Sequence, residues 1–259
     1  MAVPTFNAFS LQDENFISER ITFKGYADRG VIRGKINRRE GVKLLATEFG
    51  EKEVTIEGRV IADSASDLQS LLDDFKKNLT IEEGDLVIET GRTFNATVTS
   101  LAIPDEHYNQ STAIFEVTFL CSEPYAVSSQ VIGVIPVPSG VYTVSGTFTV
   151  SGTLFNRPIF VYSPPELTGN TLIRMMRLYH AETGQTVTIS GFGAGSSLSY
   201  QNDVTINLDD FSALEGSSTV DIGGGFQKFE PGINNVTLTA SGRAFPGGSL
   251  TVRHQPRWL

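Results

Sequence analysis

The chain has little of what disulfides, metal sites and membrane spans require. Its 259 residues include one cysteine, three histidines and one tryptophan. A single cysteine excludes an internal disulfide, and no apolar run approaches the roughly 20 residues that cross a bilayer. The first residues also lack the basic and apolar stretches of a secretory signal. We therefore expect a globular protein made in the cytoplasm, with no membrane insertion.

The titratable residues form no motif of known catalytic chemistry. His107 lies in Asp105-Glu-His107, but neighbouring residues of an extended chain point to opposite faces, which leaves a metal shell incomplete. His180 and His254 lack metal-ligand spacing and have no nucleophile motif nearby. Asp209-Asp210 is better explained as a turn than as a carboxylate pair. We predict no catalytic residue, no metal site and no cofactor.

One segment has a clear helical pattern. Leu68, Leu71, Leu72, Phe75 and Leu79 fall on one stripe at 3.6 residues per turn. At its start a serine at position 66 is followed three residues later by a glutamine, which is the spacing of a capping box. The pattern predicts an amphipathic helix at 66–79 that buries one face against a sheet.

Strand patterns surround this helix. Residues alternate between apolar and polar at 54–58, 86–88, 94–98 and 115–121, which is typical of half-buried strands. The last alternation places Cys121 in the core as an inert thiol, and Pro124 then ends the strand. The order of elements predicts an α+β domain at 1–125.

The composition changes after residue 125. Residues 126–140 are rich in Val, Ser and Pro and are predicted to form a connector. Short strand candidates follow, separated by Gly, Asn and Asp turns, which favours an all-β sandwich of jelly-roll type at 141–259. The segment at Met175 and Met176 fits either a strand or one helical turn. The whole chain is therefore expected to be mainly β.

Charge is unevenly distributed along the chain. The net charge of −9 falls almost entirely on the first 124 residues, yet a basic stripe interrupts them at Arg29, Arg33, Lys35, Arg38, Arg39 and Lys43. Glycines within the stripe favour an extended hairpin. Three interpretations stay open: nucleic-acid binding, which the scarce aromatics and surrounding acids disfavour, a docking surface for an acidic neighbour such as another copy, or a solvated hairpin.

The order of these motifs resembles the distal tail protein family of long-tailed bacteriophages. The resemblance rests on Glu53-Val-Thr-Ile-Glu-Gly58, the helix at 66–79, the strand at 115–121, the stop Ser122-Glu-Pro-Tyr125 and the turn Phe229-Glu-Pro-Gly-Ile-Asn234. The terminal Arg257-Trp258-Leu259 is also similar. The order and spacing of these motifs carry the resemblance.

This resemblance implies a structural protein of the virion tail tip and no enzyme. Its N-terminal domain would form a ring, expected to be hexameric, around the DNA channel, and its C-terminal domain would be a galectin-like sandwich that projects outward. The implied partners are further copies, the tail tube protein, the tail hub protein and a receptor-binding protein, without specific nucleic-acid binding. Exposed acids would line the channel, and the candidates are Glu48, Glu51, Glu82, Glu83 and Asp85.

A second hypothesis is that the sandwich binds host-wall glycans as a carbohydrate-binding module. Sandwich folds often host such sites, but fold analogy alone is a weak argument. Exposed aromatic side chains are typical of sugar sites, and Tyr200 and Trp258 are the candidates for glycan contact. Pure scaffolding remains the alternative for this domain.

Overall fold

The structure is a computed structural model of the whole chain. It describes residues 3–24, 29–35, 42–49, 51–80, 83–104, 111–165, 172–191, 197–199, 201–225 and 228–259. The described residues separate into two compact units. Unit 1 comprises Met1–Ser128 together with Trp258–Leu259, and unit 2 comprises Ser129–Arg257. The chain therefore leaves unit 1 once and comes back to it for its last two residues.

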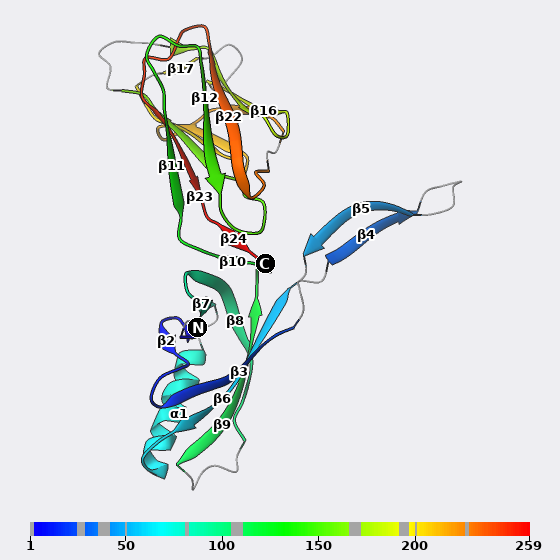
Figure 1. The fold of residues 1–259 in the computed structure, drawn as a ribbon, viewed down its shortest axis with the longest axis vertical. Helices are drawn as coiled ribbons and strands as arrows, with labels where there is room; N and C mark the ends of the chain where they lie inside the picture. The colour runs from blue at the N-terminus through cyan, green and yellow to red at the C-terminus, as the bar shows by residue number, and fades with distance from the viewer. Residues whose placement is uncertain are drawn as a thin grey trace. The chain divides into compact units, whose positions relative to one another are not determined.

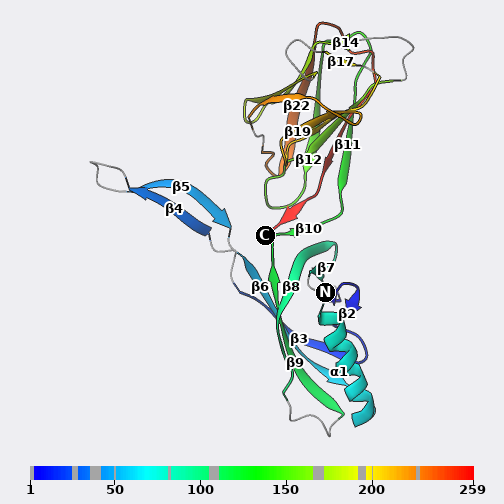
Figure 2. The same ribbon diagram turned by 180° about the vertical axis from the view of Figure 1, so that it is seen from behind.

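Unit 1 is built on a sheet of nine described strands, in which the strands of the main order β2-β1-β7-β8-β9-β6-β3 pair antiparallel. The strands are β1 (Thr5–Phe6), β2 (Phe9–Ser10), β3 (Phe16–Lys24), β6 (Lys52–Ile61), β7 (Gly84–Glu89), β8 (Arg92–Ala102), β9 (Thr112–Cys121), β10 (Ala126–Val127) and β24 (Arg257–Trp258). Short strand β10 pairs with both β8 and β24. Figures 1 and 2 show helix α1 (Ala65–Leu79) beside β3, β6 and β9.

The predicted helix exists and buries the predicted stripe. Leu68, Leu72, Phe75 and Leu79 are buried, and Leu71 packs partly buried against the same core. The Phe75 ring lies 4.9 Å from the Phe115 ring, centroid to centroid. Because each large buried apolar side chain contributes roughly 1.5 to 3 kcal/mol, this stripe holds the helix on the sheet.

The helix begins differently from the prediction, and its cap is not the expected serine. Ser64 is the N-cap: its hydroxyl oxygen accepts a hydrogen bond of 3.2 Å from the backbone N–H of Asp67. The same hydroxyl donates to the Asp67 carboxylate at 2.6 Å. The predicted capping box at Ser66 is therefore wrong, because Ser66 already lies inside the first helical turn.

The core face of the sheet also explains one glycine and the single cysteine. A Cβ atom at Gly58 would lie 2.3 Å from the carbonyl oxygen of Ile17 and 2.7 Å from the Phe115 ring, so only glycine fits beneath the aromatic cluster. Cys121 is fully buried, as its place in the alternation predicted. Burial raises the pKa of its thiol to about 11, so the thiol stays protonated and unreactive at neutral pH.

The basic stripe folds as the extended hairpin that its glycines predicted. Strands β4 (Arg29–Lys35) and β5 (Val42–Phe49) pair antiparallel and form a two-stranded sheet of their own. Their register is irregular between Ile32 and Arg33, which is the mark of a bulge. Figure 1 draws β4 and β5 as two paired strands.

Unit 2 is a β-sandwich of two antiparallel sheets. One sheet has the described order β11-β23-β13-β18-β19-β20 and the other β12-β22-β15-β16-β21. Their bounds are β11 (Val131–Pro136), β12 (Thr143–Val150), β13 (Ile159–Ser163), β15 (Met175–His180), β16 (Gln185–Ser190), β18 (Val204–Asn207), β19 (Ser212–Glu215), β20 (Ser218–Thr219), β21 (Asp221–Gly224), β22 (Gly232–Ser241) and β23 (Ser249–His254). A short pair, β14 (Leu172–Ile173) with β17 (Leu198–Ser199), completes the unit.

The two sheets enclose one apolar core. Phe148, Phe160 and Phe229 form a ring cluster with centroid separations between 5.4 and 5.8 Å. The Tyr162 hydroxyl is buried and donates a hydrogen bond of 2.7 Å to the carbonyl oxygen of Gly247, so this polar group stays satisfied inside the core. The mainly-β fold class predicted for the chain is confirmed.

The structure decides two further predictions, the connector at 126–140 and the segment at Met175 and Met176. Within 126–140, which was predicted to be a connector, Ala126–Val127 forms β10 and Val131–Pro136 pairs with β23. Its Val and Ile residues supply the strand propensity, and Pro136 is tolerated because β11 is an edge strand. Met175 and Met176 lie in strand β15, so the helical-turn alternative for them is wrong.

The helix cap gives a testable difference between two neighbouring serines. We expect Ser64→Ala to lower the free energy of unfolding of unit 1 by about 1 kcal/mol, because it removes an N-cap hydrogen bond. Ser66→Ala should change it by only a few tenths of a kcal/mol, since Ser66 is exposed within the helix. Trp258 is the one tryptophan of the chain and belongs to unit 1, so its fluorescence during urea unfolding measures both variants. Equal effects of the two substitutions would contradict the assigned cap.

Candidate interaction sites

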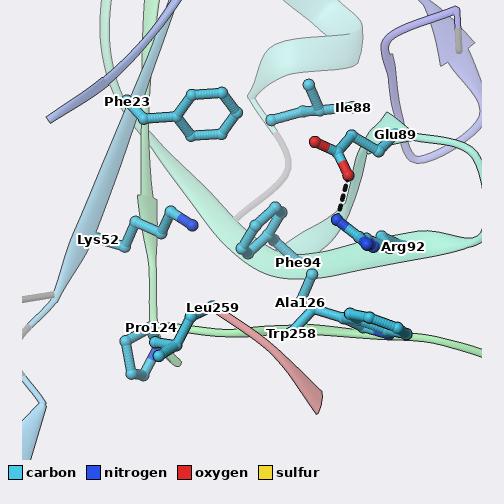
Figure 3. Close-up of a pocket in the computed structure, with 10 residues that line it drawn as sticks. All are labelled: Phe23, Lys52, Ile88, Glu89, Arg92, Phe94, Pro124, Ala126, Trp258 and Leu259. Carbon is cyan, nitrogen blue, oxygen red and sulfur yellow. Dashed lines mark hydrogen bonds and ion pairs between the residues drawn. The ribbon is translucent and has the colours of Figure 1, made fainter. Parts of the chain in front are cut away.

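A pocket opens in unit 1 where the cover of the sheet ends. Along β9, helix residue Phe75 covers Phe115, and Phe6 covers Phe119 at a ring distance of 5.1 Å. The next position on that face is Cys121, which pairs with Lys52. There a pocket of about 360 Å³ begins (Figure 3). Its apolar lining comes from Phe23, Ile88, Phe94, Pro124, Ala126 and Leu259.

Lys52 is the unusual residue of this pocket. Only 8 % of its surface is exposed, and its Nζ lies 4.5 Å from the Phe94 ring centroid and 5.2 Å from that of Phe23. Among the described residues, no hydrogen bond or ion pair reaches the ammonium group. Burial lowers the pKa of Lys52, while Cys121 and the carboxylate of Glu89 act in the opposite direction. The two aromatic faces therefore supply its nearest stabilisation.

A second cation at the rim is already neutralised. The Arg92 guanidinium donates to the Glu89 carboxylate and lies 4.2 Å from the centroid of the Trp258 ring. The indole N–H of Trp258 donates to the Ser128 hydroxyl at 3.4 Å. Figure 3 shows Lys52 pointing toward the aromatic rings, apart from the Arg92–Glu89 pair. Lys52 is thus the cation of the pocket that is left to interact with a ligand.

Some of the residues predicted to form a docking surface lie on strands β4 and β5. Arg29, Arg33 and Lys35 lie on β4 and Lys43 lies on β5, whereas Arg38 and Arg39 fall outside the described residues. The hairpin places basic β4 beside β5, which carries Lys43 and Glu48, because Gly34 pairs with Lys43 and Arg33 pairs with Leu44. Their proposed role as a docking surface stays a prediction.

The other predicted positions are spread over the molecule. Tyr200, Glu82 and His107 lie outside the described residues. Trp258 belongs to unit 1 and not to the sandwich, which removes the sandwich setting that its predicted glycan contact assumed. Of the acids predicted to line a channel, Glu51, Glu83 and Asp85 are exposed, and Glu48 lies on β5.

The two histidines of unit 2, His180 and His254, are both buried. Neither ring nitrogen of His254 has a hydrogen-bond partner among the described residues, and burial lowers its pKa. His180 is buried, and its Nε2 lies 3.1 Å from Asn234 Oδ1 and 2.9 Å from the Glu182 carboxylate. The Asn234 amide N–H₂ donates to the carbonyl oxygens of Glu230 and Gly232. Its Oδ1 therefore accepts, and Nε2 of His180 carries the proton.

The acids near these elements serve turns and ion pairs. The Asp210 carboxylate accepts from the N–H and hydroxyl of Ser212 at 3.0 and 2.6 Å, as the predicted turn requires. Asp209 forms ion pairs with Arg157 at 3.8 Å and Arg257 at 3.6 Å. Within the part of the chain that the structure describes, no three His, Cys, Asp or Glu residues converge as a metal site, and no helix is long and apolar enough to cross a membrane.

Comparisons with known proteins agree with this architecture. Residues 10–121 match the family model of the phage tail protein RIFT-related domain. The crystal structure of SPP1 Dit (gp 19.1), described as a paradigm of the hub adsorption apparatus in phages that infect Gram-positive bacteria, matches with a TM-score of 0.68 at 11% identity over 99% of each chain. No curated protein sequence matches the chain.

Two structures of the activated phage P2 baseplate are also similar. The structure with Ca matches 91% of this chain and 90% of its own chain, at 8% identity and a TM-score of 0.36. The structure with Sr matches 98% and 90%, at 8% identity and a TM-score of 0.39.

The domain match and the fold together define the class of protein: a structural component of a phage tail. More closely, the whole chain has the fold of a siphophage distal tail protein, and the resemblance found in the sequence is confirmed. The predicted place of the protein in the virion tail agrees with the same two findings.

The unpaired ammonium of Lys52 has a measurable effect on stability. We expect Lys52→Met to raise the free energy of unfolding of unit 1 at pH 7 by about 1 kcal/mol, because a buried charge without an ionic partner costs more than an apolar chain of similar length. Urea unfolding followed by Trp258 fluorescence measures the change. The exposed Lys77→Met is the matched control and should have little effect.

The same group sets the direction of a pH effect. The pKa of Lys52 is lowered in the folded protein from its ordinary value of 10.5. At pH values between the folded-state pKa and 10.5, the unfolded chain therefore binds more protons than the folded one. Stability of the wild type should therefore rise with pH across that interval, and the advantage of Lys52→Met should shrink. A constant advantage up to pH 10 would contradict the assigned burial of the charge.

Proposed function

We propose that this protein is a ring-forming element of the siphophage tail tip that joins the tail tube to the hub and receptor-binding apparatus. The observation that supports this most directly is the whole-chain fold shared with SPP1 Dit, combined with the tail-protein domain at residues 10–121. The proposed ring is hexameric and surrounds the DNA channel. The protein acts by presenting surfaces, and it carries no catalytic activity.

Charge distribution suggests how copies contact one another. The basic β4–β5 hairpin belongs to an otherwise acidic unit, while helix α1 exposes Asp67 and Asp74 on one side, seven residues apart, ahead of the exposed Lys76 and Lys77 of its last turn. A hairpin from one copy against the acidic helix face of the next is a head-to-tail contact between different surfaces. Such contacts close into a ring when the rotation between copies permits, and otherwise extend into filaments.

The acidic character of unit 1 also fits a channel through which DNA passes. Carboxylates such as those of Glu51, Glu83 and Asp85 are exposed and repel phosphate, so DNA would slide past and not adhere. Electrostatic complementarity would guide assembly of the copies. The same surface charge disfavours specific nucleic-acid binding.

Reversing the hairpin charges tests the ring. We expect the triple variant Arg29→Glu, Arg33→Glu, Lys35→Glu to abolish the closed oligomer, leaving monomer at concentrations where the wild type forms a species of about six copies. Multi-angle light scattering and negative-stain imaging measure this. A control with the same charge change on exposed sites of unit 2, Arg174→Glu, Arg177→Glu, Arg253→Glu, should keep the ring. A monomeric wild type over a wide concentration range would refute the proposal.

One surface favours glycan binding as a second function of unit 2. On the outer face of the β12–β21 sheet, Tyr179 is 40 % exposed and pairs with Thr237 on one side and Thr186 on the other. The Ser145 hydroxyl adds a further polar group, 2.9 Å from that of Thr237. An aromatic ring surrounded by hydroxyls suits the apolar face and the hydroxyl groups of a sugar.

Titration with host cell-wall polysaccharide tests this second function. We expect Tyr179→Ala to weaken binding by roughly tenfold, because it removes the stacking surface. The control Tyr142→Ala removes another exposed tyrosine of unit 2 and should leave binding unchanged. Calorimetry with the full chain measures both variants, and the absence of binding by the wild type would eliminate the glycan hypothesis without affecting the ring.

A further inference from the structure

The pocket of unit 1 holds a cation where the strand pattern requires an apolar side chain. Lys52 has the same orientation on β6 as Val54 and Ile56, which are fully buried. Substituting an apolar residue there would be expected to stabilise the fold. A lysine that remains at such a cost, aimed into a pocket with no ionic partner among the described residues, marks a binding site for an anion.

The surroundings of Lys52 define which anion fits. Glu89 acts on the pKa of Lys52 but is paired with Arg92, so the Lys52 ammonium is the one charge among the described residues of the pocket left to balance, and a single negative charge balances it. A single carboxylate can pair with the Lys52 ammonium. Because burial is what lowers the pKa of Lys52, an incoming carboxylate would stabilise the charged form.

The lining of the pocket indicates which chemical group the ligand must have beside its carboxylate. Phe23, Phe94 and Trp258 line it, and its volume of about 360 Å³ is enough for one or two side chains. A carboxylate on a purely polar carrier would leave these aromatic surfaces exposed to water. The ligand must therefore place an aliphatic or aromatic group beside its acid.

The position of the pocket indicates the source of this ligand. Phe23 is 42 % exposed, so its apolar surface continues beyond the cavity. It lies near the end of β3, which is the last strand on that side of the sheet among the described residues. An edge strand offers unpaired backbone groups to an added chain. A polypeptide can fill the pocket and cover this edge together, which a small free acid cannot.

We propose that this pocket binds a segment of a partner protein in which a carboxylate stands next to an apolar side chain. Lys52 pairs with the carboxylate, the rings of Phe23 and Phe94 contact the apolar side chain, and the stacked Arg92–Trp258 pair bounds the opening. None of the residues that line the pocket belongs to β4 or β5. Its occupation is measured separately from ring formation.

The single tryptophan makes occupation of the pocket observable. Trp258 lines the pocket and is the one tryptophan in the chain, so its emission reports on ligand entry in the full-length protein. The probe is acetyl-Phe-Asp-amide, whose blocked ends leave one carboxylate beside one aromatic ring. Its neutral analogue, acetyl-Phe-Asn-amide, has nearly the same shape. Free 3-phenylpropionate carries the same two groups without a peptide backbone.

We expect a saturable change of Trp258 emission with the aspartate peptide and binding roughly tenfold weaker with the asparagine analogue, since the charge pair is lost. Lys52→Met should weaken binding of the aspartate peptide by a similar factor, and Lys77→Met should not. Urea unfolding of Lys52→Met checks that unit 1 remains folded, so that a loss of binding can be assigned to the site. The free acid should bind more weakly than the peptide.

Three results would overturn the proposal. The first is no saturable response to the aspartate peptide, or equal binding of the two peptides or of Lys52→Met. The second is tighter binding of 3-phenylpropionate than of the peptide, which would assign the pocket to a free organic acid. The third is loss of self-association in Lys52→Met without any peptide binding, which would make a second copy the occupant. Ring formation by the wild type is scored separately, so failure here leaves the proposed function intact.

Discussion

The structure of unit 1 depends on covering the apolar face of a long sheet with a short helix. Strand β6 has 10 residues and spans roughly 33 Å at 3.3 Å per residue. Helix α1 has 15 residues and spans only about 22 Å at 1.5 Å per residue. The helix can therefore cover about two thirds of the strand's length. Phe6 extends that cover by one step, and the remaining end forms the pocket around Lys52.

The helix and the alternating strands were predictable because each pattern is local. Five apolar residues on one stripe define the buried face of α1 whatever it packs against, and the alternation that ends at Cys121 defines a core face in the same way. The cap was not predictable, because Ser64 and Ser66 are each followed three residues later by a polar side chain. Which of the two serines becomes the N-cap depends on where the chain leaves β6. Tertiary packing determines that point.

The pocket was partly visible in the sequence. Lys52 lies two residues before Val54 and four before Ile56, so all three side chains point to the same face of the strand. Extending the alternation two residues toward the N-terminus would have placed a lysine on the core face. No pattern in the sequence indicated that Trp258 lines the pocket, because the pairing of β24 with β10 joins positions about 130 residues apart. In unit 2 the turn-rich composition predicted a sandwich, but the sequence could not show that β11 is an edge strand or that Tyr179 lies among hydroxyls.

Because unit 2 occupies the chain between Ser128 and Trp258, the two units are joined by two covalent passages. Cutting the gene at residue 128 would remove the indole that stacks on Arg92 and open one wall of the first unit, so a shortened protein of that kind would be a poor representative of its parent. An excision that rejoins Ser128 to Trp258 through a brief spacer keeps the wall in place.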